Sequence, residues 1–299
     1  MLMRTNIRQK CFWTGLVLGG TVLCLLAAAP PDRAAARPNP FFAFDNGTKD
    51  AKHQTLEAQA DLLKELGYDG ISWRPAGVAP MLKVLRERQL KMFAIYTVPS
   101  IGEDGPVMDP NLRTAIKELQ GTGAFIWLGI TSKLFKPGTT NGDDQAVMLL
   151  NEVATWAAEA NLKVALYPHA GFYHERVADC LRLAEKSGHP NVGVSFNLCH
   201  SLKVGEYRQM EDLLKRAGPR LFLVSINGAD ADGRDWSTLI QTLDRGSLDL
   251  LPLFRVLREI RYAGPIGLQC YNLKGDVRDN LRRSMDAWKK YQERLAGLP

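Results

Sequence analysis

The sequence contains little cysteine, and its cysteines form no pattern. Of five cysteines, only Cys180, Cys199 and Cys270 lie beyond the N-terminal segment, and they are far apart in the chain. An odd number of widely spaced cysteines indicates neither a disulfide framework nor a zinc knuckle. We therefore expect neither in this protein.

The sequence also lacks low-complexity segments and, beyond its N-terminus, any apolar run long enough to span a membrane. Its hydrophobic fraction of 45% and its charged fraction of 23% are ordinary for a soluble globular protein. With 299 residues, the chain has the length of one large domain or two small ones.

The N-terminal segment, residues 1–36, has the pattern of a secretory signal peptide. Arg4, Arg8 and Lys10 form a basic stretch that precedes an uncharged apolar run from Cys11 to Ala29. We expect cleavage after residue 36 and a periplasmic or secreted protein. The alternative is an uncleaved N-terminal anchor, because the apolar run is close to the lower limit for spanning. Membrane association is expected only in that case.

The excess positive charge is small once this leader is set aside. Residues 1–36 carry four basic residues and one acidic residue, so the formal net charge falls from +6 to +3 without them. A charge this mild does not indicate binding to nucleic acid. We therefore predict no nucleic-acid partner.

The rest of the chain alternates between apolar strand patterns and amphipathic helix patterns. The expected strands are residues 41–47, 69–73, 91–100, 124–130, 163–169, 192–200, 221–228 and 265–271. The expected helices are residues 53–67, 78–89, 109–121, 143–160, 174–188, 206–218, 250–262 and 276–292. Gly67 is expected to end the first helix, and Asp109 to cap the third, with Pro110 in its first position.

Eight strands alternating with eight helices over about 250 residues predict a single (β/α)8 TIM barrel, here residues 37–299. The nearly continuous apolar character of the strands is typical of parallel strands that are buried on both faces. A doubly wound α/β sheet is the alternative, but it usually has a glycine-rich phosphate turn after its first strand. The corresponding stretch here, "DNGTKD", has one glycine. We therefore favour the barrel, without a second domain.

Polar side chains gather at the C-terminal ends of the predicted strands, where the active sites of TIM barrels lie. We expect catalytic roles for Asp45, His169, His200 and Asp230. We expect substrate binding by Trp73, Lys133, Tyr167, Asn197, Ser225, Asn227, Trp236, Gln269 and Asn272, whereas Trp127 is expected in the core. Uncharged hydrogen-bonding groups with aromatic rings suit a polyhydroxylated ligand such as a sugar. The alternative is that these residues are polar only because a barrel mouth is wet.

Several stretches together resemble the xylose-isomerase-like TIM barrels. The resemblance runs from about Phe41 to Tyr291 and lies in "ELGYDGISW", "VALYPH", "VGVSFNLCH", "LFLVSING" and "LDRGSLDLLPLFRVLREIRYAGPIGLQ". That family contains sugar isomerases and epimerases and metal-dependent apurinic endonucleases. The resemblance therefore implies a barrel that acts on a small carbohydrate or on abasic DNA.

The resemblance also implies a position for a divalent metal, which the family binds with Glu, Asp, His and Glu on strands five to eight. In this sequence the four matching positions are occupied by Tyr167, Asn197, Ser225 and Gln269, and a following His is kept as His200. None of the four carries a formal charge at neutral pH, whereas divalent metals prefer carboxylate or imidazole ligands. We therefore predict no metal ligands and no cofactor. A site made of His169, His200 and Asp230 is the alternative that leaves a metal open.

From these features we expect an exported barrel that binds or acts on a small carbohydrate. It resembles sugar isomerases and epimerases but lacks their metal–carboxylate mechanism; if active, isomerase, epimerase or lyase chemistry is expected. A non-catalytic sugar-binding protein is the second hypothesis. A metal-dependent apurinic endonuclease is the third, and the mild charge argues against it.

Overall fold

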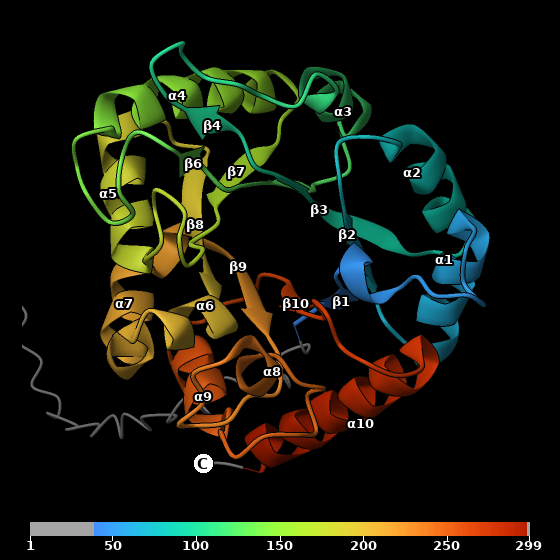
Figure 1. The fold of residues 1–299 in the computed structure, drawn as a ribbon. Coiled ribbons are helices and arrows are strands. Elements are labelled where there is room, and N and C mark those ends of the chain that lie inside the picture. The colour runs from blue at the N-terminus through green and yellow to red at the C-terminus, as the bar shows by residue number, and fades with distance from the viewer. Residues whose placement is uncertain (1–38, 298–299) are drawn as a thin grey trace, which may run out of the picture. The chain divides into compact units, whose positions relative to one another are not determined.

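The computed structural model describes residues 39–297, so the leader predicted for residues 1–36 lies outside the described part of the chain. Eight parallel strands form a closed barrel in the order β1-β10-β9-β8-β7-β5-β3-β2 (Figure 1). These strands are β1 (Phe41–Ala43), β2 (Gly70–Trp73), β3 (Lys91–Thr97), β5 (Phe125–Leu128), β7 (Lys163–Leu166), β8 (Val192–Asn197), β9 (Leu221–Ile226) and β10 (Ile266–Leu268). The predicted (β/α)8 fold is confirmed.

Helices surround the barrel and connect successive strands (Figure 1). They are α1 (Leu56–Leu66), α2 (Val78–Glu87), α3 (Leu112–Glu118), α4 (Asp143–Glu159), α5 (Val177–Ser187), α7 (Met210–Ala217), α9 (Leu251–Glu259) and α10 (Val277–Ala296). As predicted, Gly67 ends α1, where it takes a left-handed conformation with φ of 84° that glycine adopts without steric cost.

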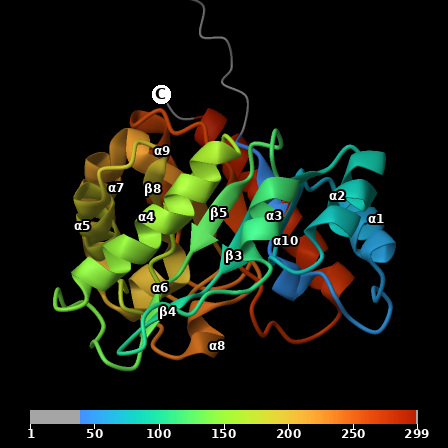
Figure 2. The ribbon, with the colours of Figure 1, turned by 90° about the horizontal axis from the view of Figure 1, so that it is seen from above.

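Short elements lie between the strand ends and the outer helices. They are β4 (Ser100–Ile101), β6 (Thr131–Ser132), α6 (Leu198–Lys203), α8 (Trp236–Leu239) and the 3-10 helices η1 (Asp45–Gly47), η2 (Glu206–Gln209) and η3 (Gly218–Arg220). Strands β4 and β6 pair with each other in a separate two-stranded sheet. Figure 2 shows β4, α6 and α8 at the same end of the barrel.

The core consists of two hydrophobic clusters. The larger one fills the space between the strands and the outer helices, and the smaller one lies inside the barrel. The inner cluster is rich in aromatic residues, including Phe42, Phe44, Phe93, Trp127 and Tyr167. Because side chains alternate along a strand, Phe42 belongs to the inner cluster whereas its neighbours Phe41 and Ala43 belong to the larger one. The inner cluster therefore supports the side chains at the C-terminal ends of the strands.

Several predicted element boundaries differ from the observed ones by a few residues, and three of them show the cause. The strand predicted for residues 192–200 ends at Asn197, and helix α6 follows at once. The strand predicted for residues 41–47 ends at Ala43 and continues into a 3-10 helix. Helix α3 is preceded by Asn111 rather than capped by Asp109, whose side chain instead accepts a hydrogen bond from the Asn111 backbone. The first two differences lie where a strand ends at the barrel mouth, and the third lies where a helix begins. Apolar patterns locate such boundaries poorly.

None of the helices within residues 39–297 has the length and apolar character needed to cross a bilayer.

Candidate active site

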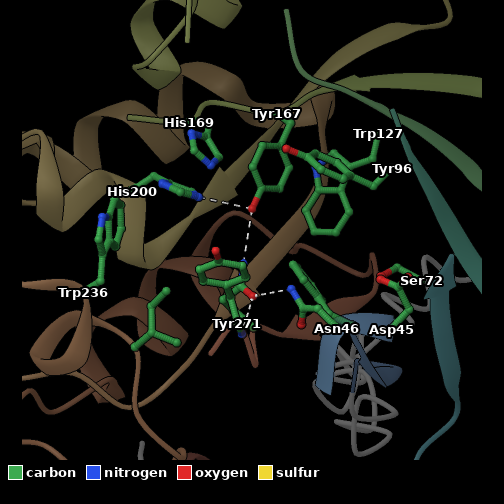
Figure 3. Close-up of a pocket in the computed structure, with 13 residues that line it drawn as sticks. Asp45, Asn46, Ser72, Tyr96, Trp127, Tyr167, His169, His200, Trp236 and Tyr271 are labelled. Carbon is green, nitrogen blue, oxygen red and sulfur yellow. Dashed lines mark hydrogen bonds between the residues drawn. The ribbon is translucent and has the colours of Figure 1, made fainter. Parts of the chain in front are cut away.

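A cavity of about 370 Å³ lies at the C-terminal ends of the barrel strands (Figure 3). This volume is near the lower end of the range of ligand pockets, roughly 300–1,000 Å³, so the cavity suits one small ligand. It is lined by Phe44, Asp45, Asn46, Ser72, Tyr96, Trp127, Tyr167, His169, His200, Trp236, Ile240, Gln269 and Tyr271.

Aromatic rings line the cavity at two depths. Trp127 and Tyr167 are buried, and their ring centroids are 4.8 Å apart in an edge-on arrangement. The indole Nε1 of Trp127 donates a hydrogen bond of 2.8 Å to Ser195 Oγ, which holds the ring in place. Nearer the solvent, Trp236 and Tyr271 keep 37% and 60% of their surface exposed. A ligand in this cavity therefore meets apolar ring surfaces both at the floor and at the rim.

The hydrogen bonds of Gln269 determine how its amide is oriented. The backbone N–H of Tyr271 donates to Gln269 Oε1 over 2.9 Å, and Asn46 Nδ2 donates to the same oxygen over 3.1 Å. The Nε2 group therefore faces the Tyr167 hydroxyl, 3.4 Å away. Since an amide nitrogen can only donate, the oxygen of Tyr167 accepts this hydrogen bond.

His200 lies on the other side of the same hydroxyl. Its Nε2 is 3.3 Å from Tyr167 Oη, and Figure 3 shows the two hydrogen bonds that meet at this oxygen. Because Gln269 already donates to Tyr167, the phenol proton remains available for His200 or for a ligand oxygen.

His169 is held between two rings and has a defined tautomer. Its ring centroid is 3.8 Å from that of Phe172 and 3.8 Å from that of His200. Its Nδ1 is 2.9 Å from the carbonyl oxygen of Ala170. A carbonyl oxygen only accepts, so Nδ1 carries the proton and Nε2 of the neutral ring is bare. No hydrogen bond joins this Nε2 to another residue of the described chain.

Burial determines the protonation state of these groups. It lowers the pKa of His169 below its usual value, and it lowers the pKa of His200 further, with the neighbouring His169 acting in the same direction. Burial also raises the pKa of Tyr167 well above its ordinary value. At neutral pH the site therefore contains two neutral imidazoles and a protonated phenol.

Asp45 lies across the cavity from these residues (Figure 3). It follows β1, which is four strands away from β7 in either direction around the closed barrel. Burial raises the pKa of Asp45, and the Arg74 guanidinium, whose Nη1 is 3.1 Å from Oδ2, opposes this effect. Asp45 is the one carboxylate among the described residues that line the cavity.

The structure brings together six of the thirteen side chains predicted for the site. Those that line the cavity are Asp45, Tyr167, His169, His200, Trp236 and Gln269. Those that do not are Trp73, Lys133, Asn197, Ser225, Asn227, Asp230 and Asn272. The two groups have different structural surroundings.

Three of the residues outside the lining are fully buried polar groups that hold strand ends together. Asn197 Nδ2 donates to the carbonyl of Pro168 over 2.9 Å, and its Oδ1 accepts from Ser225 Oγ over 3.0 Å. Asn227 Nδ2 donates to the carbonyls of Gly228 and Leu239. Contrary to our expectation, these side chains are placed to support the mouth rather than to touch a ligand.

The remaining residues outside the lining contact neighbouring loops or solvent. Trp73 is buried and donates through Nε1 to the carbonyl of Ala76. Asp230 accepts a hydrogen bond from the backbone of Ser247. Lys133 and Asn272 are exposed. The ligand-stacking role expected for Trp73 thus conflicts with its position, because its ring is covered by protein.

Seven residues of the lining were not among the predicted site residues. They are Phe44, Asn46, Ser72, Tyr96, Trp127, Ile240 and Tyr271. Most end or follow a strand on the face that points into the barrel, so the alternation of side chains was a usable signal. Trp127 is fully buried, as expected for a core residue, and it also forms the floor. Ile240 comes from a loop that no strand pattern could place.

The residues at the positions of the family's metal ligands do not fit a divalent cation. Asn197 and Ser225 are hydrogen-bonded to each other, the Gln269 oxygen already accepts two hydrogen bonds, and Tyr167 remains a neutral phenol. Within residues 39–297 no group of three or more His, Cys, Asp or Glu side chains is arranged to hold a metal. Asp230, the third member of the alternative His169–His200 site, does not line the cavity.

The fold and the site define a (β/α)8 barrel with a cavity at the C-terminal ends of its strands. The family model described as xylose isomerase-like TIM barrel matches residues 60–291. The chain therefore belongs to the xylose isomerase-like TIM barrel family. No curated protein sequence matches it.

Solved structures of this fold include several sugar epimerases. The 3-keto-D-glucoside 4-epimerase from E. coli is 15% identical, with a TM-score of 0.63, over 85% of this chain and 99% of that chain. D-allulose 3-epimerase from Methylomonas sp. in complex with D-allulose is 16% identical, with a TM-score of 0.64, over 85% and 97%. IOLI protein with a bound zinc atom is 13% identical, with a TM-score of 0.66, over 87% and 100%. At these identities the similarity establishes the fold.

Proposed function

We propose that the cavity binds a monosaccharide or a small sugar derivative and supports isomerase- or epimerase-type chemistry on it. The observation that carries this proposal is the lining itself. Apolar ring surfaces lie next to neutral hydrogen-bonding groups, and two uncharged histidines face the same space. A polyhydroxylated ligand needs both kinds of contact. The sugar epimerases of the same fold support the choice of ligand class.

We further propose that this chemistry needs no resident divalent metal. The neutral, hydrogen-bonded side chains at Tyr167, Asn197, Ser225 and Gln269 support this, because a cation there has no charged ligand. The leader predicted for residues 1–36 supports export, so that the protein meets its sugar in the periplasm or outside the cell. The mild net charge supports a partner other than nucleic acid.

A non-catalytic sugar-binding protein is the second candidate function. The observation that favours it is the set of hydrogen bonds that fixes Asn197, Ser225 and Gln269 in place, since a prearranged neutral site suits recognition without proton transfer.

Sugar binding to the purified protein tests the proposed function. Titration calorimetry and tryptophan fluorescence would be measured with D-glucose, D-fructose, D-allulose and methyl glucosides, and metal content by elemental analysis. We expect binding of at least one sugar, a fluorescence change from Trp127 and Trp236, and binding that survives treatment with a chelator. Trp236→Ala should weaken binding, whereas Trp156→Ala on α4 should not.

Two results would contradict the proposal. The first is the absence of binding to every sugar tested. The second is a stoichiometric metal whose removal abolishes binding. Incorporation of deuterium from D₂O into a bound sugar separates the enzyme from the second candidate function.

A further inference from the structure

We propose that His169 and Tyr167 form a metal-free pair that enolises a carbonyl-bearing sugar, with Gln269 as the positioning residue. This inference rests on the proposed function and specifies its substrate class and its groups. His169 Nε2 acts as the base, and the Tyr167 hydroxyl donates a hydrogen bond to the carbonyl oxygen.

The base of the pair is His169 Nε2. Because Nδ1 of His169 donates to the Ala170 carbonyl over 2.9 Å, the neutral ring has its lone pair on Nε2. Phe172 and His200 cover the two faces of the ring, each at 3.8 Å between centroids. These contacts fix the plane of the ring, and a flip of the ring within that plane would lose the hydrogen bond to Ala170. His169 also lines the cavity, so a basic nitrogen of fixed direction is presented to a ligand.

The hydrogen-bond donor of the pair is the Tyr167 hydroxyl. The backbone N–H of Tyr271 imposes the orientation of the Gln269 amide, so Gln269 Nε2 donates to the Tyr167 oxygen. Tyr167 thereby directs its own proton elsewhere, to His200 Nε2 at 3.3 Å when no ligand is present. A ligand oxygen that enters the cavity competes with His200 for this proton. Tyr167 thus serves as a donor to the ligand, as an electrophilic group must.

Tyr167 and His169 lie near each other in the cavity. The ring centroids of Tyr167 and His169 are 5.9 Å apart, and Figure 3 shows both residues on one wall of the cavity. A carbonyl oxygen and the hydrogen on the neighbouring carbon are separated by only a few bonds. One sugar can therefore present its carbonyl to Tyr167 and its adjacent C–H to His169 at the same time.

The chemistry balances without a co-reactant. His169 Nε2 takes the proton from the carbon next to the carbonyl as the C–H bond breaks. The electron pair forms a carbon–carbon double bond, and the carbonyl π pair moves to the oxygen that Tyr167 hydrogen-bonds. The product of this step is an enediolate. Return of the proton from the His169 imidazolium to the same carbon re-forms the original sugar. Return to the former carbonyl carbon gives the isomeric sugar, with the remaining hydroxyl proton passing to the former carbonyl oxygen as the new carbonyl forms. Exchange of the imidazolium proton with solvent labels the product.

The surroundings of His169 determine how the reaction depends on pH. The titratable groups around it are His200 on α6, Tyr167 after β7, and His174 and Glu175 before α5. Asp45 and its partner Arg74 lie across the cavity. Burial lowers the pKa of His169, so the base is neutral above that lowered pKa and is lost as the pH falls through it.

The experiment follows deuterium incorporation from D₂O into D-fructose, D-allulose and D-glucose by NMR, with binding measured in parallel. We expect exchange with the wild-type protein, with a rate that stays constant at neutral pH and falls only when the pH drops through the lowered pKa of His169. His169→Gln should lower the exchange rate by at least about 100-fold while binding is kept. Tyr167→Phe should lower both. His189→Gln, in the connection between α5 and β8, is the matched control and should change neither.

A second variant tests the positioning role of Gln269. In Gln269→Glu the carboxylate accepts the phenol proton, so Tyr167 no longer donates to the ligand and affinity falls about 10-fold at pH 8. Protonation of this Glu at lower pH restores the donor, so the affinity of the variant should rise as the pH falls while that of the wild type stays flat. A role in packing alone predicts no such pH dependence.

The outcomes separate this inference from the proposed function. If no sugar binds, the proposed function fails. If a sugar binds but the wild type exchanges no deuterium, or if His169→Gln exchanges normally, the enolising pair is refuted and sugar binding stands. The tautomer can be read without any ligand, by ¹⁵N NMR of the histidine rings. A proton on Nε2 of His169 in the neutral protein would overturn the assignment of the base.

Discussion

At the scale of single residues, the buried asparagine at the end of β8 shows how a neutral side chain suits this site. Asn197 is fully buried and uses both ends of its amide, one to donate to Pro168 and the other to accept from Ser225. A carboxylate has no proton to donate to a carbonyl oxygen. An ionised aspartate here would therefore place a carboxylate oxygen against the carbonyl oxygen of Pro168, and two acceptors would face each other. The amide therefore matches its protein neighbours better than an acid does.

Asn197→Asp should reduce the free energy of unfolding by about 1–3 kcal/mol at neutral pH. Burial raises the pKa of such a carboxyl group, so the loss grows as the pH rises through that raised value and shrinks on acidification. Urea denaturation at several pH values measures the effect, with the exposed Asn141→Asp as control. Recovery of stability on adding zinc or magnesium would show that a metal can occupy this position, contrary to our proposal.

His174 predicts a second pH effect, in this case on the wild-type fold. It is fully buried, and burial lowers its pKa to about 4, whereas the unfolded chain takes up this proton near pH 6.5. Stability is therefore complete above pH 6.5 and falls toward pH 4, by up to about 1.4 kcal/mol per pH unit from this residue. His174→Gln should flatten that part of the profile, and His189→Gln should leave it unchanged. Equal slopes in wild type and His174→Gln would refute the assignment.

At the scale of elements, helix α5 begins with help from a residue of another element. Glu206, in η2, is buried, and its two oxygens accept hydrogen bonds from the backbone N–H groups of Val177 and Ala178 over 3.0 and 3.3 Å. The first N–H groups of a helix have no partner within the helix. Glu206 therefore caps α5 from outside and fixes the end of the segment that includes His169.

Glu206→Ala should lower stability by about 1–3 kcal/mol and should expose the first turn of α5. Hydrogen exchange at the amides of Val177 and Ala178 reports this directly and should accelerate. Glu211→Ala on α7, where the side chain is exposed, serves as the comparison. Unchanged protection of these two amides would mean that the cap contributes nothing to the helix.

The connection between β8 and α6 shows why element boundaries matter for the site. The apolar pattern of "VGVSFNLCH" suggested a strand up to His200, but the chain becomes helical at Leu198. Because a helix turns its side chains by about 100° per residue, Cys199 is buried and His200 reaches the cavity. Burial raises the pKa of Cys199 to about 12, which agrees with an unreactive thiol.

At the scale of the whole molecule, the barrel is closed by pairing its first and last strands. Phe41 on β1 is in register with Ile266 on β10, and α10 covers this junction. Trp288 on α10 stacks on Phe41 with a centroid distance of 4.5 Å and contacts Phe254 edge-on at 5.6 Å. One tryptophan thus joins the two ends of the fold.

Trp288→Ala should reduce the free energy of unfolding by about 3–5 kcal/mol, the usual cost of removing a large buried aromatic side chain. Circular dichroism and fluorescence should show one common transition at lower denaturant concentration, because closure involves the whole barrel. Trp156→Ala, at a partly exposed position, should cost much less. Separate transitions by the two methods would mean that the ends of the barrel unfold independently.

The sequence by itself determined the fold and the region of the site. Eight alternating apolar strands and amphipathic helices are a local signal of a parallel α/β fold. Their number, and the lack of a glycine-rich turn after the first strand, favoured the barrel over a doubly wound sheet. The alternation of side chains along each strand, which is a separate signal, placed Tyr167, His169 and Gln269 on the inner face at the strand ends.

The tertiary structure alone decided which strand-end residues meet in one cavity and which way their hydrogen bonds run. Asn197 and Ser225 share the inner face with Gln269, yet they bond to each other and to Pro168, a pairing between segments that the sequence leaves far apart. The direction of the Tyr271–Gln269–Tyr167 chain depends on a backbone N–H and an amide that only folding brings together. The strand patterns predict which face of a strand a side chain is on and the order of the strands in the chain. The burial of a side chain and the identity of its hydrogen-bond partner depend on contacts across the barrel.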